Sequence, residues 1–179
     1  MKNLRTEKLV LASLMAAMTT VGTMLIKVPA IKGYIHIGDS IVYLCGILLG
    51  PVLGGIAAGL GSFIADMLLG YAVYAPATFM IKGLDAMLVG FIYFKLLPDG
   101  ASIVQKTMKF IIAVVAGGIV MVGGYFVYEV FLYGVEGAAA GIAYNVTQAV
   151  GGGILAYPLL IALDKVNLVN KIKKKTSHV

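Results

Sequence analysis

Long apolar runs separated by short polar stretches dominate the chain. A helix needs roughly 20 mostly apolar residues to cross about 30 Å of hydrocarbon, and Pro29, Gly50 and Pro51 mark breaks between runs. The pattern predicts an all-α integral membrane protein with six transmembrane helices in a single domain over residues 1–179. The predicted helices, the second of them short, cover residues 9–26, 40–49, 51–69, 76–97, 108–132 and 138–163.

Composition supports this class. The chain is 60% hydrophobic and 12% charged, with a mean hydropathy of +0.98, which a water-soluble domain would not show. The net charge of +6 raises the alternative of a nucleic-acid partner, but the basic residues cluster at the ends of apolar runs, where topology signals are placed. We therefore expect no nucleic-acid binding. Cys45 is the only cysteine and behaves as a small hydrophobe.

The basic residues also predict the orientation, because cytoplasmic loops carry an excess of Lys and Arg. With the N and C termini both cytoplasmic, the outer side carries only Lys27 and Lys32. The inner side then holds Lys2, Arg5, Lys8, Lys95, Lys106, Lys109, Lys165, Lys171, Lys173, Lys174 and Lys175. Residues 165–179 are predicted to be a solvated basic tail near anionic lipid. A cleaved signal peptide is a weaker alternative, because its removal would spoil the charge bias.

Lys82 does not fit the apolar pattern, and Asp85 follows it by one turn inside a predicted helix. Ionisable residues at membrane depth are costly and mark solute sites by default. Glu129 shares a helix face with Tyr125, and the same spacing rule pairs Asn145 with Gln148. These side chains predict a small-molecule pocket that opens outward. The alternative is a structural ion pair of Lys82 with Asp85 or Glu129 and a belt of interfacial tyrosines.

The stretch 27–39 is long enough to fold over such a pocket as an outer lid loop, although an ordinary polar turn would also fit. Asp39 opens the following helix from the outer side, and Asp66 is expected to be interfacial. His36 predicts no metal site, because His178 lies in the opposite tail, and no cofactor is expected. The predicted substrate-binding residues are Glu129, Asn145, Gln148, Lys82, Tyr125, Tyr74, Asp39 and His36.

Other function classes lack the residues they need. The chain has no G-x-x-x-x-G-K-[ST] phosphate loop, and no histidine at membrane depth that could activate a serine. An enzyme is therefore not expected. An oligomeric channel or facilitator would need a continuous polar path, but the inner halves of the third and sixth predicted helices hold mostly Gly, Ala, Leu and Ile. A solute-capturing subunit of a larger machine fits best.

The chain resembles the S components of energy-coupling factor (ECF) vitamin transporters over nearly its whole length. The matching features are Gly38-Asp39, the run Leu49-Gly50-Pro51-Val52-Leu53-Gly54-Gly55, Ser62 to Asp66, Tyr71-Ala72-Val73-Tyr74-Ala75-Pro76-Ala77-Thr78, Ile81-Lys82-Gly83, and the pair Ala12 and Ala16. Small residues at the spacing of Ala12 and Ala16 make a face on which another helix can pack.

The resemblance implies a subunit of the prokaryotic plasma membrane that captures a vitamin from outside. It would dock on a membrane scaffold, the T component, which two cytoplasmic ATPases drive, and Ala12 and Ala16 would form the docking face. The branch it most resembles takes riboflavin, pyridoxine or hydroxymethylpyrimidine. A carboxylate, two carboxamides and tyrosines suit a small ring, so pyridoxine (vitamin B6) and hydroxymethylpyrimidine are expected ahead of riboflavin.

Overall fold

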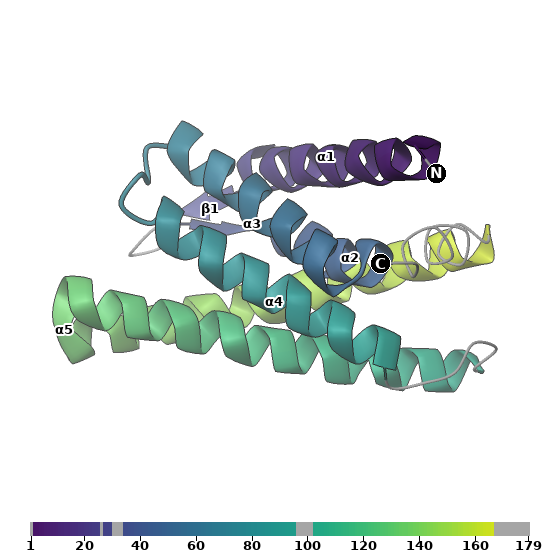
Figure 1. The fold of residues 1–179 in the computed structure, drawn as a ribbon. Coiled ribbons are helices and arrows are strands. Elements are labelled where there is room, and N and C mark those ends of the chain that lie inside the picture. The colour runs from purple at the N-terminus through teal and green to yellow at the C-terminus, as the bar shows by residue number, and fades with distance from the viewer. Residues whose placement is uncertain (1, 26, 30–33, 96–101, 167–179) are drawn as a thin grey trace.

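The computed structural model describes residues 2–25, 27–29, 34–95 and 102–166. These residues form a helical bundle with one short hairpin at its end (Figure 1). The helices are α1 (Lys2–Leu25), α2 (Gly38–Leu49), α3 (Pro51–Leu68), α4 (Ala75–Lys95) and α5 (Ile103–Lys165). The predicted helix ends at Ile26 and Leu97, the loop residues Lys32 and Gly33, and the tail 167–179 lie outside the described residues.

The predicted lid loop contains regular structure, which corrects the purely helical prediction. Strands β1 (Lys27–Pro29) and β2 (Tyr34–His36) pair antiparallel, with Lys27 opposite His36 and Pro29 opposite Tyr34. Strands this short gave no alternating pattern in the sequence, and a two-stranded hairpin is marginal on its own. The hairpin lies beside the ends of the helices, and β2 contacts both α1 and α5.

The last helix folds back on itself. Within α5, Gly134 has φ 73° and ψ 173°, a backbone conformation that favours glycine. The two arms, residues 103–133 and 135–165, run antiparallel: Lys106 Nζ donates to Asp164 Oδ2 at 2.6 Å, and the hydroxyls of Thr107 and Tyr157 are also 2.6 Å apart. The arms correspond to the predicted fifth and sixth helices. The break between them is confined to Gly134, because residues 133 and 135–137 are helical.

The surface of the bundle is apolar, as in a multi-pass membrane protein. Large side chains such as Leu25, Phe91 and Phe131 are exposed. Within the described residues, four helices are long and apolar enough to cross a membrane, and the 63-residue α5 is one of them. At 1.5 Å per residue, the 12-residue α2 is about 18 Å long and almost wholly buried. Six crossings therefore stay a prediction.

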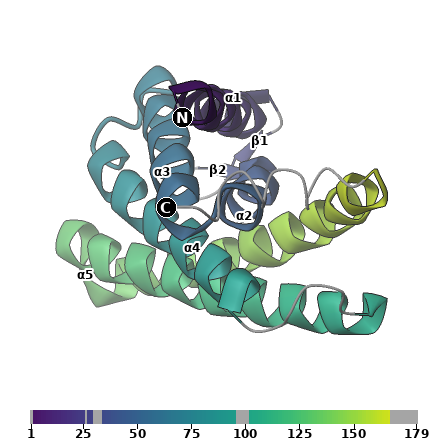
Figure 2. The ribbon, with the colours of Figure 1, turned by 45° about the vertical axis from the view of Figure 1, so that its right-hand side comes forward.

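The two ends of the bundle differ. The start of α1, the end of α4 and both ends of α5 lie at one end, whereas the hairpin, the α3–α4 connection and the Gly134 kink lie at the other (Figures 1 and 2). Helix α2 passes between α1, α3, α4 and α5. The start of α1 and the end of α5 thus lie at the same end of the bundle, which agrees with the prediction that both termini are on one side of the membrane. Which side faces the cytoplasm stays a prediction.

Candidate functional site

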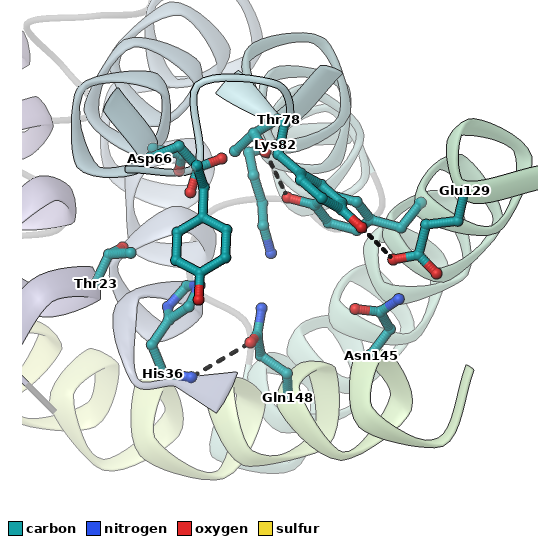
Figure 3. A pocket seen from close by; sticks show the side chains of 12 residues that line it. Thr23, His36, Asp66, Thr78, Lys82, Glu129, Asn145 and Gln148 are labelled. Atoms are coloured by element: carbon teal, nitrogen blue, oxygen red, sulfur yellow. Dashed lines mark hydrogen bonds between the residues drawn. The ribbon is translucent and has the colours of Figure 1, made fainter. Parts of the chain in front are cut away.

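A cavity of about 60 Å³ lies at the hairpin end of the bundle (Figure 3). Segments that are far apart in the sequence meet around it: α1, β2, α3, the α3–α4 connection, α4 and both arms of α5. Its lining residues are Thr23, His36, Ser62, Asp66, Tyr71, Tyr74, Thr78, Lys82, Tyr125, Glu129, Asn145 and Gln148. All the predicted substrate-binding residues except Asp39 are among them.

Lys82 forms a buried ion pair with Asp39, a partner that differs from the Asp85 or Glu129 of the alternative interpretation. Lys82 Nζ lies 2.5 Å from Asp39 Oδ1, and the two side chains are 1% and 0% exposed. The ammonium also contacts Met121 Sδ at 2.7 Å and lies 5.6 Å from the centre of the Tyr125 ring. These contacts leave Lys82 little capacity for a ligand, because an ammonium has three donors.

Asp85 faces another helix although it lies one turn from Lys82. A Cβ placed on Gly117 of α5 would come within 2.2 Å of Asp85 Oδ1, so the carboxyl group lies against the α5 backbone. Neither of its oxygens has a hydrogen-bond partner among the described residues. The i, i+3 spacing places two side chains on one helix face, but tertiary packing gave Lys82 the partner from α2.

Gln148 links this ion pair to the hairpin. Its Nε2 donates to Asp39 Oδ2 at 3.1 Å, and its Oε1 accepts from the backbone N–H of His36 at 3.3 Å (Figure 3). Both halves of the carboxamide are thus engaged. Asn145, one turn earlier on the same arm, also lines the cavity and is less buried.

The opposite wall is formed by a carboxylate and tyrosines. Glu129 is 4% exposed, and its Oε1 lies 3.5 Å from the Tyr74 hydroxyl. Tyr125 donates to Thr78 Oγ1 at 3.1 Å. Tyr128 packs edge-on against Tyr74, with ring centres 5.7 Å apart. The alternative of a tyrosine belt at the interface therefore does not describe Tyr74 and Tyr125, which face the cavity.

Asp66 was predicted to be interfacial, and this is wrong. It is 7% exposed and lines the cavity together with Ser62, one turn earlier on α3. The i, i+4 spacing of these two polar residues in an otherwise apolar helix is the signal that could have identified them. Thr23 and Thr78 also belong to the lining, but a lone threonine in an apolar helix carries no comparable signal.

His36 is uncharged at neutral pH in the folded protein. Its Nδ1 accepts a hydrogen bond from the Gly38 N–H at 3.0 Å, so the ring proton lies on Nε2. Burial lowers the pKa of His36 from 6.5 to about 4; Asp39 opposes this shift and Lys82 adds to it. No group of three or more His, Cys, Asp or Glu side chains within the described residues could hold a metal ion.

The lowered pKa of His36 predicts a loss of stability in acid. Between pH 6.5 and about 4 the unfolded chain binds a proton at His36 that the folded protein does not, so the free energy of unfolding falls as the pH falls. We expect the melting temperature to drop more between pH 7 and 4.5 for the wild type than for His36→Gln. Equal pH slopes for the two proteins would contradict the buried neutral imidazole.

Ala12 and Ala16 do not line the cavity and lie on a separate apolar groove between α1 and α3. They are half-buried, and the groove has a volume of about 540 Å³. Its other walls come from side chains such as Leu53, Ile56 and Leu60. The surface predicted as a flat docking face is therefore concave, and its docking role stays a prediction.

Comparison with known proteins identifies the family to which the chain belongs. The family model for the S component of ECF-type riboflavin transporters matches residues 3–165. The chain belongs to this family. ECF S components are subunits of transporters and not an enzyme family. The resemblance seen in the sequence is thereby confirmed.

Relatives of this S component span nearly its whole length. An uncharacterized protein of Pyrococcus woesei is 38% identical over 148 residues, which cover 82% of this chain and 94% of that protein. The thiamine precursor transporter HmpT of Lactococcus lactis subsp. cremoris is 27% identical over 177 residues, or 97% of this chain and 98% of HmpT.

A solved S component of a bacterial ECF transporter has the same fold. It superposes with a TM-score of 0.68 and 22% sequence identity, covering 90% of this chain and 98% of that one. At this identity the likeness concerns the fold alone. The two chains thus share the arrangement of their helices.

Proposed function

We propose that this S component captures a single-ring vitamin or vitamin precursor, most closely of the hydroxymethylpyrimidine type, from the outer side of the membrane. The observation that carries the proposal is the cavity itself. A carboxylate, two carboxamides and tyrosine rings surround a space of about 60 Å³. Polar groups that converge on a cavity beside aromatic side chains are typical of a solute site.

The size and the chemistry of the lining favour a small ring. An aminopyrimidine offers an exocyclic amine as a donor and ring nitrogens as acceptors, which match the Glu129 carboxylate and the Asn145 carboxamide. Tyr125 and Tyr74 supply aromatic surface for the ring. The relative HmpT, named as a thiamine precursor transporter, supports this choice. Pyridoxine is a single ring of similar size but lacks the exocyclic amine.

Riboflavin is the second candidate, because the family model carries its name. A flavin has three fused rings and a ribityl chain, and the cavity of about 60 Å³ would have to expand considerably to admit it. A channel is disfavoured by the bundle interior. Beside the cavity lie the buried Lys82–Asp39 pair and the fully buried side chains of Tyr43 and Ile47, so the described interior is packed where a channel would need a continuous polar path.

The transport cycle would need partners. The chain contains no phosphate-binding loop of the P-loop type, so energy must come from other subunits. In our proposal the chain crosses the membrane six times with both termini cytoplasmic, and the cavity faces outward. It docks through Ala12 and Ala16 on a T component that two cytoplasmic ATPases drive.

Mass spectrometry of the protein purified in detergent tests the capture function directly. A bound vitamin at one equivalent, together with titration by hydroxymethylpyrimidine, pyridoxine and riboflavin, would name the substrate. We expect hydroxymethylpyrimidine to bind most tightly. Stoichiometric riboflavin would replace the proposed substrate, and a protein that retains and binds none of the three would count against vitamin capture.

Glu129→Gln is expected to weaken binding of the ring ligand by about 1 to 3 kcal/mol, because a charge-assisted hydrogen bond to a buried carboxylate is lost. Isothermal titration calorimetry measures the change. Glu136→Gln is the matched control, since Glu136 lies on the same helix but is exposed. The same affinity for both variants would remove Glu129 from the binding site.

A further inference from the structure

Asp39 was predicted to bind substrate, but it does not line the cavity. It lies behind the lining, at the start of α2, where it contacts both α4 and α5. We propose that Asp39 is a positioning residue: through Gln148, it holds strand β2 closed over the cavity. Consecutive contacts connect Lys82 to Asp39, Asp39 to Gln148, and Gln148 to the backbone of His36.

The Asp39 carboxylate is fixed from two sides. Oδ1 lies 2.5 Å from Lys82 Nζ, and Oδ2 accepts from Gln148 Nε2 at 3.1 Å. On the α5 side, a Cβ placed on Gly152 would come within 2.6 Å of Asp39 Cβ, so α5 can approach this closely only with a glycine there. The side chain is 0% exposed. Asp39 is thus a rigid acceptor at a fixed place beside Gln148.

A rigid acceptor determines which way the carboxamide of Gln148 faces. An amide offers donors at nitrogen and acceptors at oxygen, and the carboxylate accepts only from the nitrogen. Oε1 must then face the other way, toward the N–H of His36, 3.3 Å away. With the amide reversed, oxygen would face carboxylate oxygen and the NH2 group would face the N–H. Both contacts would be repulsive, so Asp39 selects the orientation that holds β2.

This assignment separates two roles within the cavity wall. Gln148 lines the cavity and bonds the strand above it, whereas Asp39 does not line the cavity and acts on this contact through Gln148. A ligand that competes for the Gln148 carboxamide would therefore weaken the closure of β2. Gln148 belongs both to the cavity wall and to the contact with β2. Ligand binding and the position of β2 are therefore coupled through this side chain.

Hydrogen–deuterium exchange at the backbone amide of His36 tests the first link, in the full-length protein without ligand. Gln148→Leu keeps the volume of the side chain but removes the acceptor, so exchange should be on the order of ten-fold faster. Asn145→Leu removes a carboxamide from the same wall and should leave this exchange at the wild-type rate. Wild-type exchange in Gln148→Leu would overturn the proposal.

The double variant Asp39→Leu/Lys82→Met tests the role of Asp39. It removes both charges together, and such replacements of buried pairs are often tolerated, which a melting curve checks. We expect His36 to exchange several-fold faster even though Gln148 is present, because the carboxamide has lost its anchor. Wild-type exchange would show that Gln148 orients itself and that Asp39 only neutralises Lys82, which would overturn the proposal.

The contact between Gln148 and β2 does not depend on the proposed function, and only the reason for holding β2 over the cavity rests on that function. Because exchange is measured without ligand, the two failures are distinguishable. A wild-type protein that binds none of the three vitamins would reject the proposed function, whereas an unchanged His36 amide in the variants would reject the positioning role.

Discussion

Lys82→Met alone is expected to destabilise the folded protein by about 3 to 5 kcal/mol, because it leaves the Asp39 carboxylate buried without its counter-charge. The Lys82 and Asp39 side chains are 1% and 0% exposed, so water cannot replace the ammonium without opening the bundle. Reversible unfolding in detergent, followed by a helix signal, measures the loss.

Two comparisons identify the cause of this loss. Adding Asp39→Leu to Lys82→Met should recover most of the lost stability, because no unpaired charge remains. Lys106→Met removes the cation of a more exposed pair, whose side chains are 31% and 20% exposed, and should cost no more than about 1 kcal/mol. A double variant as unstable as Lys82→Met would show that the lost packing of Lys82, and not the charge of Asp39, is responsible.

The sequence predicted the helices and most of the cavity for the same physical reason. In an apolar chain a polar residue at membrane depth is costly, so its presence is informative. Lys82, Glu129, Asn145 and Gln148 were conspicuous among Leu, Ile, Val and Ala, and all four line the cavity. A similar residue in a soluble protein would be one of many polar side chains.

The contacts of these residues could not be predicted, because they depend on tertiary packing. The partner of Lys82 is Asp39, which is 43 positions away in the sequence, whereas the nearer Asp85 is directed against α5. Asp66 was misread because closeness to a helix end resembles an interfacial position. The hairpin escaped prediction because its strands of three residues are held by contacts with α1 and α5 and not by their own pattern.

Ala16→Trp is expected to abolish vitamin uptake while ligand affinity stays within about two-fold of the wild type. Ala16 lies on the groove between α1 and α3, and an indole there would fill the space that the T component is proposed to enter. Thr23, the α1 residue that lines the cavity, is seven positions away, or about 10 Å along a helix. Uptake is measured in vesicles that contain the T component and both ATPases, and binding in detergent.

Met18→Trp is the control that makes this experiment specific. Met18 is 44% exposed, lies on the same helix and is absent from the groove lining, so an indole at this position would face lipid and uptake should persist. The groove is the docking surface only if the two tryptophans differ in uptake and agree in binding. Loss of binding in Ala16→Trp would mean that α1 and α3 separate when the groove is filled, and normal uptake in both variants would place docking on another face.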